Sequence, residues 1–158
     1  MTAFAFVFPG QGSQSVGMLS AWGDHPAVRA TLEEASAALG EDVARLIGEG
    51  PKEALDLTTN TQPVMLTAGI ANYRAWLAEG GAAPAIVAGH SLGEYTALVA
   101  AGSLTLMDAL TVLRKRSGKL ERFASARYCS QRGRRKHHLI PLHLRGQIRQ
   151  LALCKLQQ

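Results

Sequence analysis

The stretch from Pro84 to Ala101, PAIVAGHSLGEYTALVAA, decides the fold of this 158-residue chain. Its apolar start, residues 84–88, predicts a buried strand, and residues 94–101 have the composition of a helix. Between them lies GHSLG, residues 89–93, a Gly-x-Ser-x-Gly pattern. A strand, this pattern and a helix in succession form the context in which the pattern indicates a nucleophilic serine, here Ser91.

The turn around Ser91 must be tight. A side chain at position 89 or 93 would collide with neighbouring backbone, and glycine avoids this collision. The Ser91 hydroxyl would then project from the sheet beside a helix N-terminus, which favours developing negative charge. The alternative interpretation is a turn of small residues without catalytic meaning.

The rest of the pattern places this turn in a larger sheet. Residues 3–8 predict a second buried strand, and the glycine-rich residues 9–17 predict a loop whose backbone can approach a ligand. We expect Thr61 to be the N-cap of the longest helix, with Pro63 in its first turn. Helices are predicted at residues 26–39, 42–47, 52–57, 61–79 and 105 to at least 116. This order predicts an α/β fold with a parallel sheet and helices on both faces.

Charge divides the chain into two segments. Residues 1–116 hold 7 Lys and Arg against 11 Asp and Glu, whereas residues 117–158 hold 10 basic residues and one acid, Glu121. The helical periodicity also degrades near this point. We therefore expect a folded segment at residues 1–123 and a basic tail at residues 124–158.

The N-terminus has no basic stretch before its apolar run, and Pro9-Gly10 interrupts that run early. This is atypical of a signal peptide or a membrane span, so we expect a cytoplasmic protein without a membrane partner. The two cysteines, Cys129 and Cys154, both lie in the basic segment. They do not form a disulfide framework of the secreted type.

Three motifs in order closely resemble the malonyl-CoA:acyl-carrier-protein transacylases of bacterial fatty-acid synthesis. They are FPGQGSQ at residues 8–14, TQP at residues 61–63 and GHSLGEY at residues 89–95. The resemblance covers roughly residues 3–123. It implies an α/β-hydrolase-like acyltransferase core that uses no metal and no cofactor.

The resemblance also implies a two-step transfer and roles for individual residues. Ser91 would take the malonyl group from malonyl-CoA and pass it to the phosphopantetheine thiol of acyl carrier protein. The backbone amides of Gln11 and Leu92 would form the oxyanion hole. Gln11 has an alternative role as a simple turn residue.

Arg116 matches the arginine that pairs with the free carboxylate of malonate in the family, a task suited to a planar guanidinium. Arg114 and Lys115 lie close enough for an alignment error, and a basic last turn would also complement the helix dipole. Adjacent residues on a tight turn point apart, so we do not expect His90 to take the Ser91 proton. The resemblance implies instead that His90 is a positioning residue. Gln62 would line the pocket or only begin a helix.

The resemblance stops before the general base. In the family a distant histidine has this role, beyond a ferredoxin-like subdomain, and neither is recognisable here. The expected core is therefore incomplete and its base unknown. Without the strands of that missing part, the serine-bearing strand becomes an exposed edge, so marginal stability and low activity are expected. His137, His138 and His143 do not lie in the family context.

The basic tail has three interpretations. A shifted reading frame or truncated gene explains its arginine-rich, acid-poor composition. A nucleic-acid-binding arm lacks the interleaved aromatic residues that stack on bases. A zinc site would have to combine residues whose spacing fits no standard pattern, namely Cys129, His137, His138, His143 and Cys154.

Two main hypotheses remain for the whole chain. It is an acyltransferase or the catalytic front half of one, or it is a non-catalytic remnant that binds coenzyme A or carrier protein. A hydrolase of the Gly-x-Ser-x-Gly type is a weaker third hypothesis, since Gln11 and Arg116 favour acyl transfer.

Overall fold

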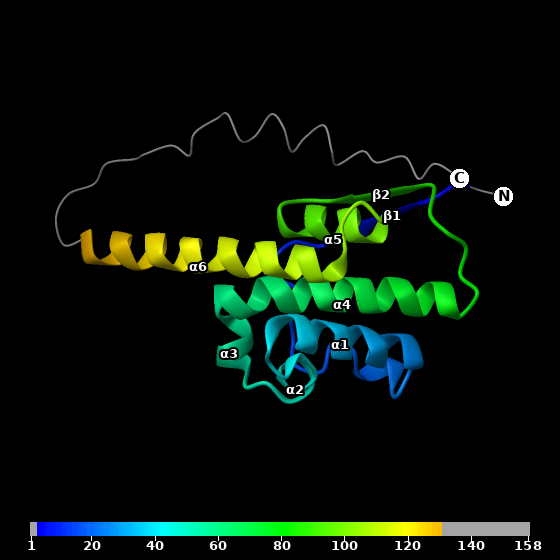
Figure 1. Cartoon of the computed structure of the whole chain (residues 1–158), viewed down its shortest axis with the longest axis horizontal. Coiled ribbons are helices and arrows are strands. Elements are labelled where there is room, and N and C mark those ends of the chain that lie inside the picture. The colour runs from blue at the N-terminus through cyan, green and yellow to red at the C-terminus, as the bar shows by residue number, and fades with distance from the viewer. Residues whose placement is uncertain (1–2, 131–158) are drawn as a thin grey trace.

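A computed structural model describes the backbone of residues 3–130 and the side chains of residues 3–118. The elements follow in the order β1 (Ala5–Phe8), a 3-10 turn (Ser20–Trp22), α1 (Pro26–Leu39), α2 (Val43–Glu49), α3 (Lys52–Asp56), α4 (Thr58–Ala78), β2 (Ile86–Gly89), α5 (Leu92–Ala100) and α6 (Leu106–Ser130). Figure 1 shows α4 lying between α1 and α6, with the small sheet beyond α5. The predicted α/β class is confirmed.

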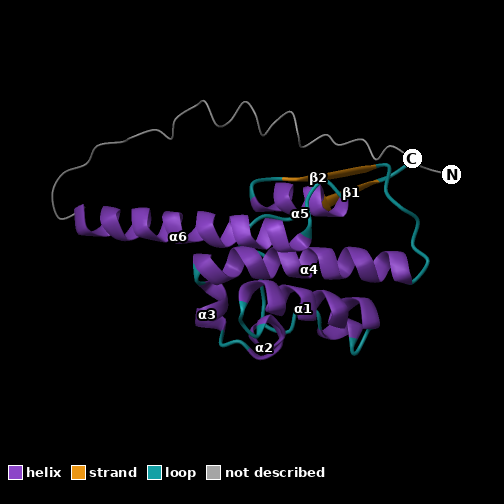
Figure 2. Ribbon diagram, in the orientation of Figure 1, coloured by secondary structure: helices purple, strands orange, loops and turns teal. Residues whose placement is uncertain are grey.

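The sheet consists of β1 and β2 in the described part of the chain (Figure 2). The strands pair in parallel with Ala5 opposite Ile86 and Phe8 opposite Gly89. Both strands therefore end at the same edge, so the loop after β1 and the turn after β2 leave the sheet together. In open α/β sheets this edge is where ligands bind.

The two faces of this sheet differ. Phe6 and Phe8 point toward α4, where their rings pack edge-on against Tyr73 at centroid distances of 5.7 and 6.2 Å. On the opposite face Val7 is 73% exposed and Ile86 is 42% exposed. Parallel sheets are almost always covered on both faces. Helices are expected on both faces of the sheet. In the described residues they cover one face, which agrees with an incomplete core.

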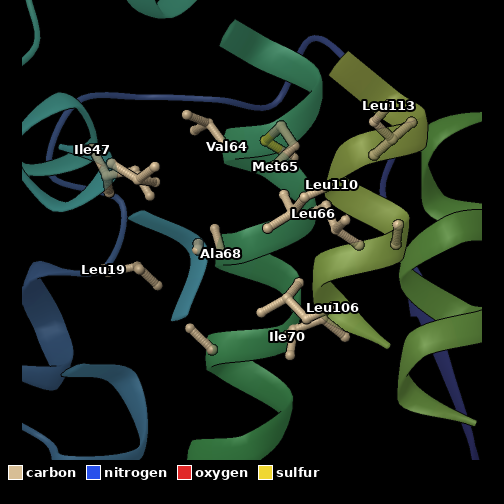
Figure 3. Close-up of a cluster of buried hydrophobic side chains, with 14 of the residues drawn as sticks. Leu19, Ile47, Val64, Met65, Leu66, Ala68, Ile70, Leu106, Leu110 and Leu113 are labelled. Atoms are coloured by element: carbon tan, nitrogen blue, oxygen red, sulfur yellow. The ribbon is translucent and has the colours of Figure 1, made fainter. Parts of the chain in front are cut away.

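The main core forms around α4. Residues 61–68 are all buried, whichever way they point from the helix axis. A helix segment that is buried on every side must be surrounded by other elements. Figure 3 shows side chains of α4 meeting side chains of α6 in this core, which includes Val64, Met65, Leu66, Ile70, Leu106, Leu110 and Leu113.

The start of α4 corrects the sequence prediction. The helix begins at Thr58 with Leu57 as its N-cap residue, so Pro63 lies inside the helix and Thr61 is not the cap. The Thr61 side chain is fully buried, and its hydroxyl oxygen lies 2.6 Å from the carbonyl oxygen of Leu55 and 3.0 Å from that of Leu57. The threonine thus satisfies carbonyls at the α3–α4 junction, which is a tertiary role that a cap motif does not reveal.

The start of α6 agrees with the prediction. The Asp108 amide donates to the Thr105 hydroxyl at 3.1 Å, and this hydroxyl lies 2.7 Å from the Asp108 carboxylate. This capping arrangement fixes the start of the helix close to residue 105, where the sequence predicts it. The helix continues without a break through residue 123 to Ser130. The boundary between residues 1–123 and 124–158 stays a prediction, since most of the tail lies outside the described residues.

Candidate functional site

Ser91 occupies a strained turn between β2 and α5. Its backbone angles are φ 56° and ψ −103°. Among the described residues, no other non-glycine residue has a positive φ. An L-residue in this region costs about 1–3 kcal/mol and persists where the surroundings impose it. Such strain is typical of functional turns, and it lies on the residue that the sequence singles out.

The flanking glycines are required by close backbone approach, as expected. A Cβ at position 89 would lie 2.1 Å from the carbonyl carbon and oxygen of Gly93. A Cβ at position 93 would lie 2.3 Å from the carbonyl oxygen of Phe8. The first glycine allows the tight turn, and the second allows the end of β1 to pass directly over the start of α5.

This approach brings the loop after β1 to the serine turn. A Cβ built on Gly10 would be in ordinary contact, 3.5 Å, with the carbonyl oxygen of His90. Gln11, the next residue, is exposed at the same sheet edge, while the Leu92 side chain is buried in the core. Leu92 is the first residue of α5, so no carbonyl within the helix accepts its amide hydrogen. The backbone of the loop after β1 and the backbone of the serine turn thus lie close together at this edge of the sheet.

Side-chain hydrogen bonds fix the loop that carries Gln11. The Gln14 carbonyl oxygen accepts the Gly12 amide at 2.9 Å, and its NH2 group donates to the Asp56 carboxylate of α3 at 2.9 Å. Hydrogen bonds from Lys52 and then Gln14 lower the pKa of Asp56 below its ordinary value of 3.8. Gln14 therefore ties the loop to the helical layer. The sequence motif contains Gln14, but its spacing does not indicate this role.

Arg116 of α6 reaches Ser91 across 25 positions of sequence. Its Nη2 donates a hydrogen bond to the Ser91 hydroxyl oxygen at 3.0 Å. Its guanidinium carbon lies 5.6 Å from the ring centroid of Tyr95, over the ring. The guanidinium thus lies between the Ser91 hydroxyl and the face of the Tyr95 ring. A cation–π contact of this kind contributes about 0.5–2 kcal/mol.

Ion pairing separates Arg116 from the other described arginines. Arg29, Arg45, Arg74 and Arg114 each pair with a carboxylate. Within residues 3–118 no carboxylate pairs with Arg116. Arg114, the alternative in the alignment, is bound to Glu41 and to the side chain of Asn60. Among the described arginines, the one that faces Ser91 is therefore also the one left available for an anionic ligand.

Gln62 is 3% exposed and lies in the buried first part of α4. Its side-chain carbonyl oxygen has no hydrogen-bond partner among the described residues. Leaving a buried acceptor unpaired costs about 1–3 kcal/mol, so such groups are rare in folded proteins. Gln62 is not at the helix start, which removes the simple alternative that it only begins α4.

A base for Ser91 is absent from the described side chains. His90 is exposed, and His25 contacts Glu79 at 3.0 Å instead. No histidine or carboxylate of residues 3–118 is hydrogen-bonded to the Ser91 hydroxyl. His137, His138, His143 and Cys154 of the zinc alternative lie outside the described residues, as does the Cys129 side chain. Thus Ser91, Leu92 and Arg116 come together beside the Gln11 loop, without a base.

Two further features lie away from this site. A cavity of about 350 Å³ between α1 and α2 is lined by residues such as Val28, Leu32 and Ala44, and none of its lining residues belongs to the site. In the described part of the chain no helix is long and apolar enough to cross a membrane.

The sequence and the fold of this chain are similar to those of known proteins. The chain is 56% identical over 117 residues to the malonyl CoA-acyl carrier protein transacylase of Escherichia coli K12, covering 73% of this chain and 38% of the relative. An acyl-carrier-protein S-malonyltransferase structure from Burkholderia pseudomallei 1710b matches with TM-score 0.72 and 66% identity, over 74% of this chain and 38% of that one. A complex of a type II polyketide acyl-carrier protein with its malonyl-transacylase matches with TM-score 0.71 and 47% identity, again over 74% and 38%.

The chain therefore spans little more than a third of the length of these relatives. The family model described as the acyl transferase domain matches residues 5–142, which include every candidate site residue and extend past the predicted boundary at residue 123. With this match, and with a strained serine turn between a parallel strand and a helix, the chain belongs to the acyl transferase domain family.

Proposed function

We propose that this chain carries the serine-acylation centre of a malonyl transferase, with Ser91 as the nucleophile. The observation that carries the proposal is the hydrogen bond from Arg116 to Ser91, made by an arginine without a carboxylate partner in residues 3–118. A malonyl thioester presents a reactive carbonyl and a free carboxylate a short distance apart. Ser91 and Arg116 supply a nucleophile and a neighbouring cation, in contact at 3.0 Å.

The first step is acylation of the serine. The Ser91 oxygen attacks the thioester carbonyl of malonyl-CoA, and its proton leaves to a base that the described residues do not include. The oxyanion forms against the backbone amides of Leu92 and Gln11, and one such donor contributes about 3 kcal/mol to transition-state stability. The carbon–sulfur bond then breaks, and coenzyme A leaves as a thiolate that takes up the proton.

The second step reverses the first with a different thiol. The phosphopantetheine sulfur of acyl carrier protein attacks the malonyl ester, the Ser91 oxygen leaves and recovers a proton, and the malonyl thioester is transferred. Throughout, Arg116 would hold the free carboxylate through paired hydrogen bonds, which an acetyl group cannot make. His90 and Gln62 would line the same pocket, with the unpaired oxygen of Gln62 as an acceptor for substrate or ordered water.

We expect the chain by itself to react slowly. Loss of a general base costs about 10²–10⁴-fold in rate. The strained Ser91 turn, the adjacent loop and Arg116 are nevertheless all present, so acylation at long incubation times is the appropriate readout. We also propose that the protein acts in the cytoplasm, in bacterial fatty-acid synthesis, as its resemblance to the transacylases implies.

Intact mass measurement after incubation with malonyl-CoA tests the proposal. We expect one malonyl adduct, lost in Ser91→Ala. Arg116→Ala should slow malonyl addition by about 10- to 100-fold, because hydrogen bonds to charged groups contribute about 1.5–3 kcal/mol. Arg114→Ala is the matched control on the same helix, and its rate of malonyl addition should equal that of the parent chain.

Two outcomes would contradict the proposal. A parent chain that never acquires the adduct would favour the non-catalytic remnant that only binds coenzyme A or carrier protein. An adduct that persists in Ser91→Ala would place the reactive group elsewhere.

A further inference from the structure

Tyr95 stands outside every role assigned so far, although it touches the site. It lies on the first turn of α5, the helix that begins directly after Ser91. Side chains on a helix lean toward its N-terminus. The Tyr95 ring therefore leans back toward the serine turn, where the Arg116 guanidinium lies 5.6 Å from the ring centroid.

We infer that Tyr95 is a positioning residue that sets donor specificity by fixing the plane of the Arg116 guanidinium. This inference rests on the proposed function. Arginine recognises a carboxylate through two parallel N–H bonds, and these require the guanidinium plane to contain the carboxylate oxygens. A long side chain held at one point only, by the Ser91 hydroxyl, can still rotate out of that plane. The face of the Tyr95 ring, over which the guanidinium lies, is a second contact that restricts this rotation.

Arg116 depends on the ring contact for its orientation, because no carboxylate of residues 3–118 orients it. The other arginines within residues 3–118 are oriented by carboxylates, as Arg114 is by Glu41. A carboxylate at Arg116 would compete with an anionic substrate for the same N–H groups. An aromatic face orients the cation without occupying those donors. Tyr95 thus orients the Arg116 guanidinium without occupying the N–H groups that would bind an anionic substrate.

The alternative is that Tyr95 only packs. It is half-buried and contacts the main hydrophobic cluster. Two variants separate these roles. Tyr95→Leu retains apolar bulk and removes the aromatic face, while Tyr95→Phe retains the face and removes only the hydroxyl. A packing role predicts that Tyr95→Leu behaves like Tyr95→Phe.

The experiment compares the rates of malonyl and acetyl adduct formation at Ser91 of the full chain by intact mass. In Tyr95→Leu the malonyl rate should fall about 3- to 10-fold while the acetyl rate stays unchanged, because only malonyl uses Arg116. Tyr95→Phe should keep the parent ratio. In an Arg116→Ala background, Tyr95→Leu should have no further effect on the ratio, since the two residues act as a pair.

Each other result overturns the inference in an identifiable way. Equal loss of both adduct rates in Tyr95→Leu would show a structural role. An unchanged ratio in Tyr95→Leu, with Arg116→Ala still selective against malonyl, would overturn this inference and leave the proposed function intact. A parent chain without any adduct would overturn both.

Discussion

Replacing Gly93 with alanine tests how the site is assembled. The added Cβ would lie 2.3 Å from the Phe8 carbonyl oxygen and 3.1 Å from that of Pro9. Real Cβ atoms almost never approach another atom within 3.0 Å, so the end of β1 must move away by about 0.7 Å. The atoms in the way are backbone, so no side-chain rotation relieves the contact.

Two consequences should follow from this displacement. Overpacking of a well-packed region costs about 1–3 kcal/mol, and backbone obstruction favours the upper part of this range. At a typical slope for small proteins, about 2 kcal/mol lowers the urea midpoint by about 1 M. The same shift moves the Gln11 loop away from Ser91, and a misplacement near 1 Å can cost about 100-fold in rate.

Urea unfolding followed by tryptophan fluorescence is a suitable assay. Trp22 donates to the Asn72 side chain at 2.7 Å, and Trp76 packs edge-on against Phe6 of β1. The two tryptophans thus report on both the helical layer and the sheet. Adduct formation with malonyl-CoA then gives the effect on the site.

Gly48→Ala is the matched control. Gly48 lies in α2, and a Cβ there would meet nothing within 4 Å. Because alanine is a better helix former than glycine, this variant should be more stable by up to about 1 kcal/mol. A Gly93→Ala protein as stable and as reactive as the parent would refute the argument that Gly93 is needed for the approach of β1 to the serine turn.

Three further predictions concern single features of the structure. Gln62→Met removes the unpaired buried oxygen, so it should stabilise the chain by about 1 kcal/mol in thermal unfolding while slowing malonyl adduct formation; a variant that is both less stable and fully reactive would contradict this. Val7→Lys places a charge on the uncovered sheet face, so light scattering should show slower aggregation with little change in unfolding midpoint, and faster aggregation would count against an open face. The lowered pKa of Asp56 means that its bonds to Lys52 and Gln14 stabilise the chain above the ordinary carboxyl pKa of 3.8. This contribution is lost as pH falls through the still lower folded-state pKa, so protection of the Gly12 amide from exchange should persist at pH 4. It should disappear in Asp56→Ala, which removes the acceptor, and protection that survives this substitution would exclude the anchoring role.

Sequence alone determined those features that depend on local steric and chemical rules. The tight turn at residues 89–93 was predictable because only glycine tolerates the backbone contacts that a strand-to-helix reversal imposes. The start of the last helix near residue 105 was predictable for a similar reason, since its cap involves residues three positions apart. The prediction that Ser91, Gln11 and Arg116 form one site came from a resemblance, and its oxyanion-hole assignments stay proposals.

Only the tertiary structure decided which groups meet across long sequence separations. Arg114 and Arg116 are indistinguishable by residue type, and their difference arises because α6 packs so that one reaches Glu41 and the other reaches Ser91. The ring of Tyr95 meets Arg116 because α5 and α6 pack side by side. Packing of distant elements depends on the sum of many weak contacts, which no local pattern encodes.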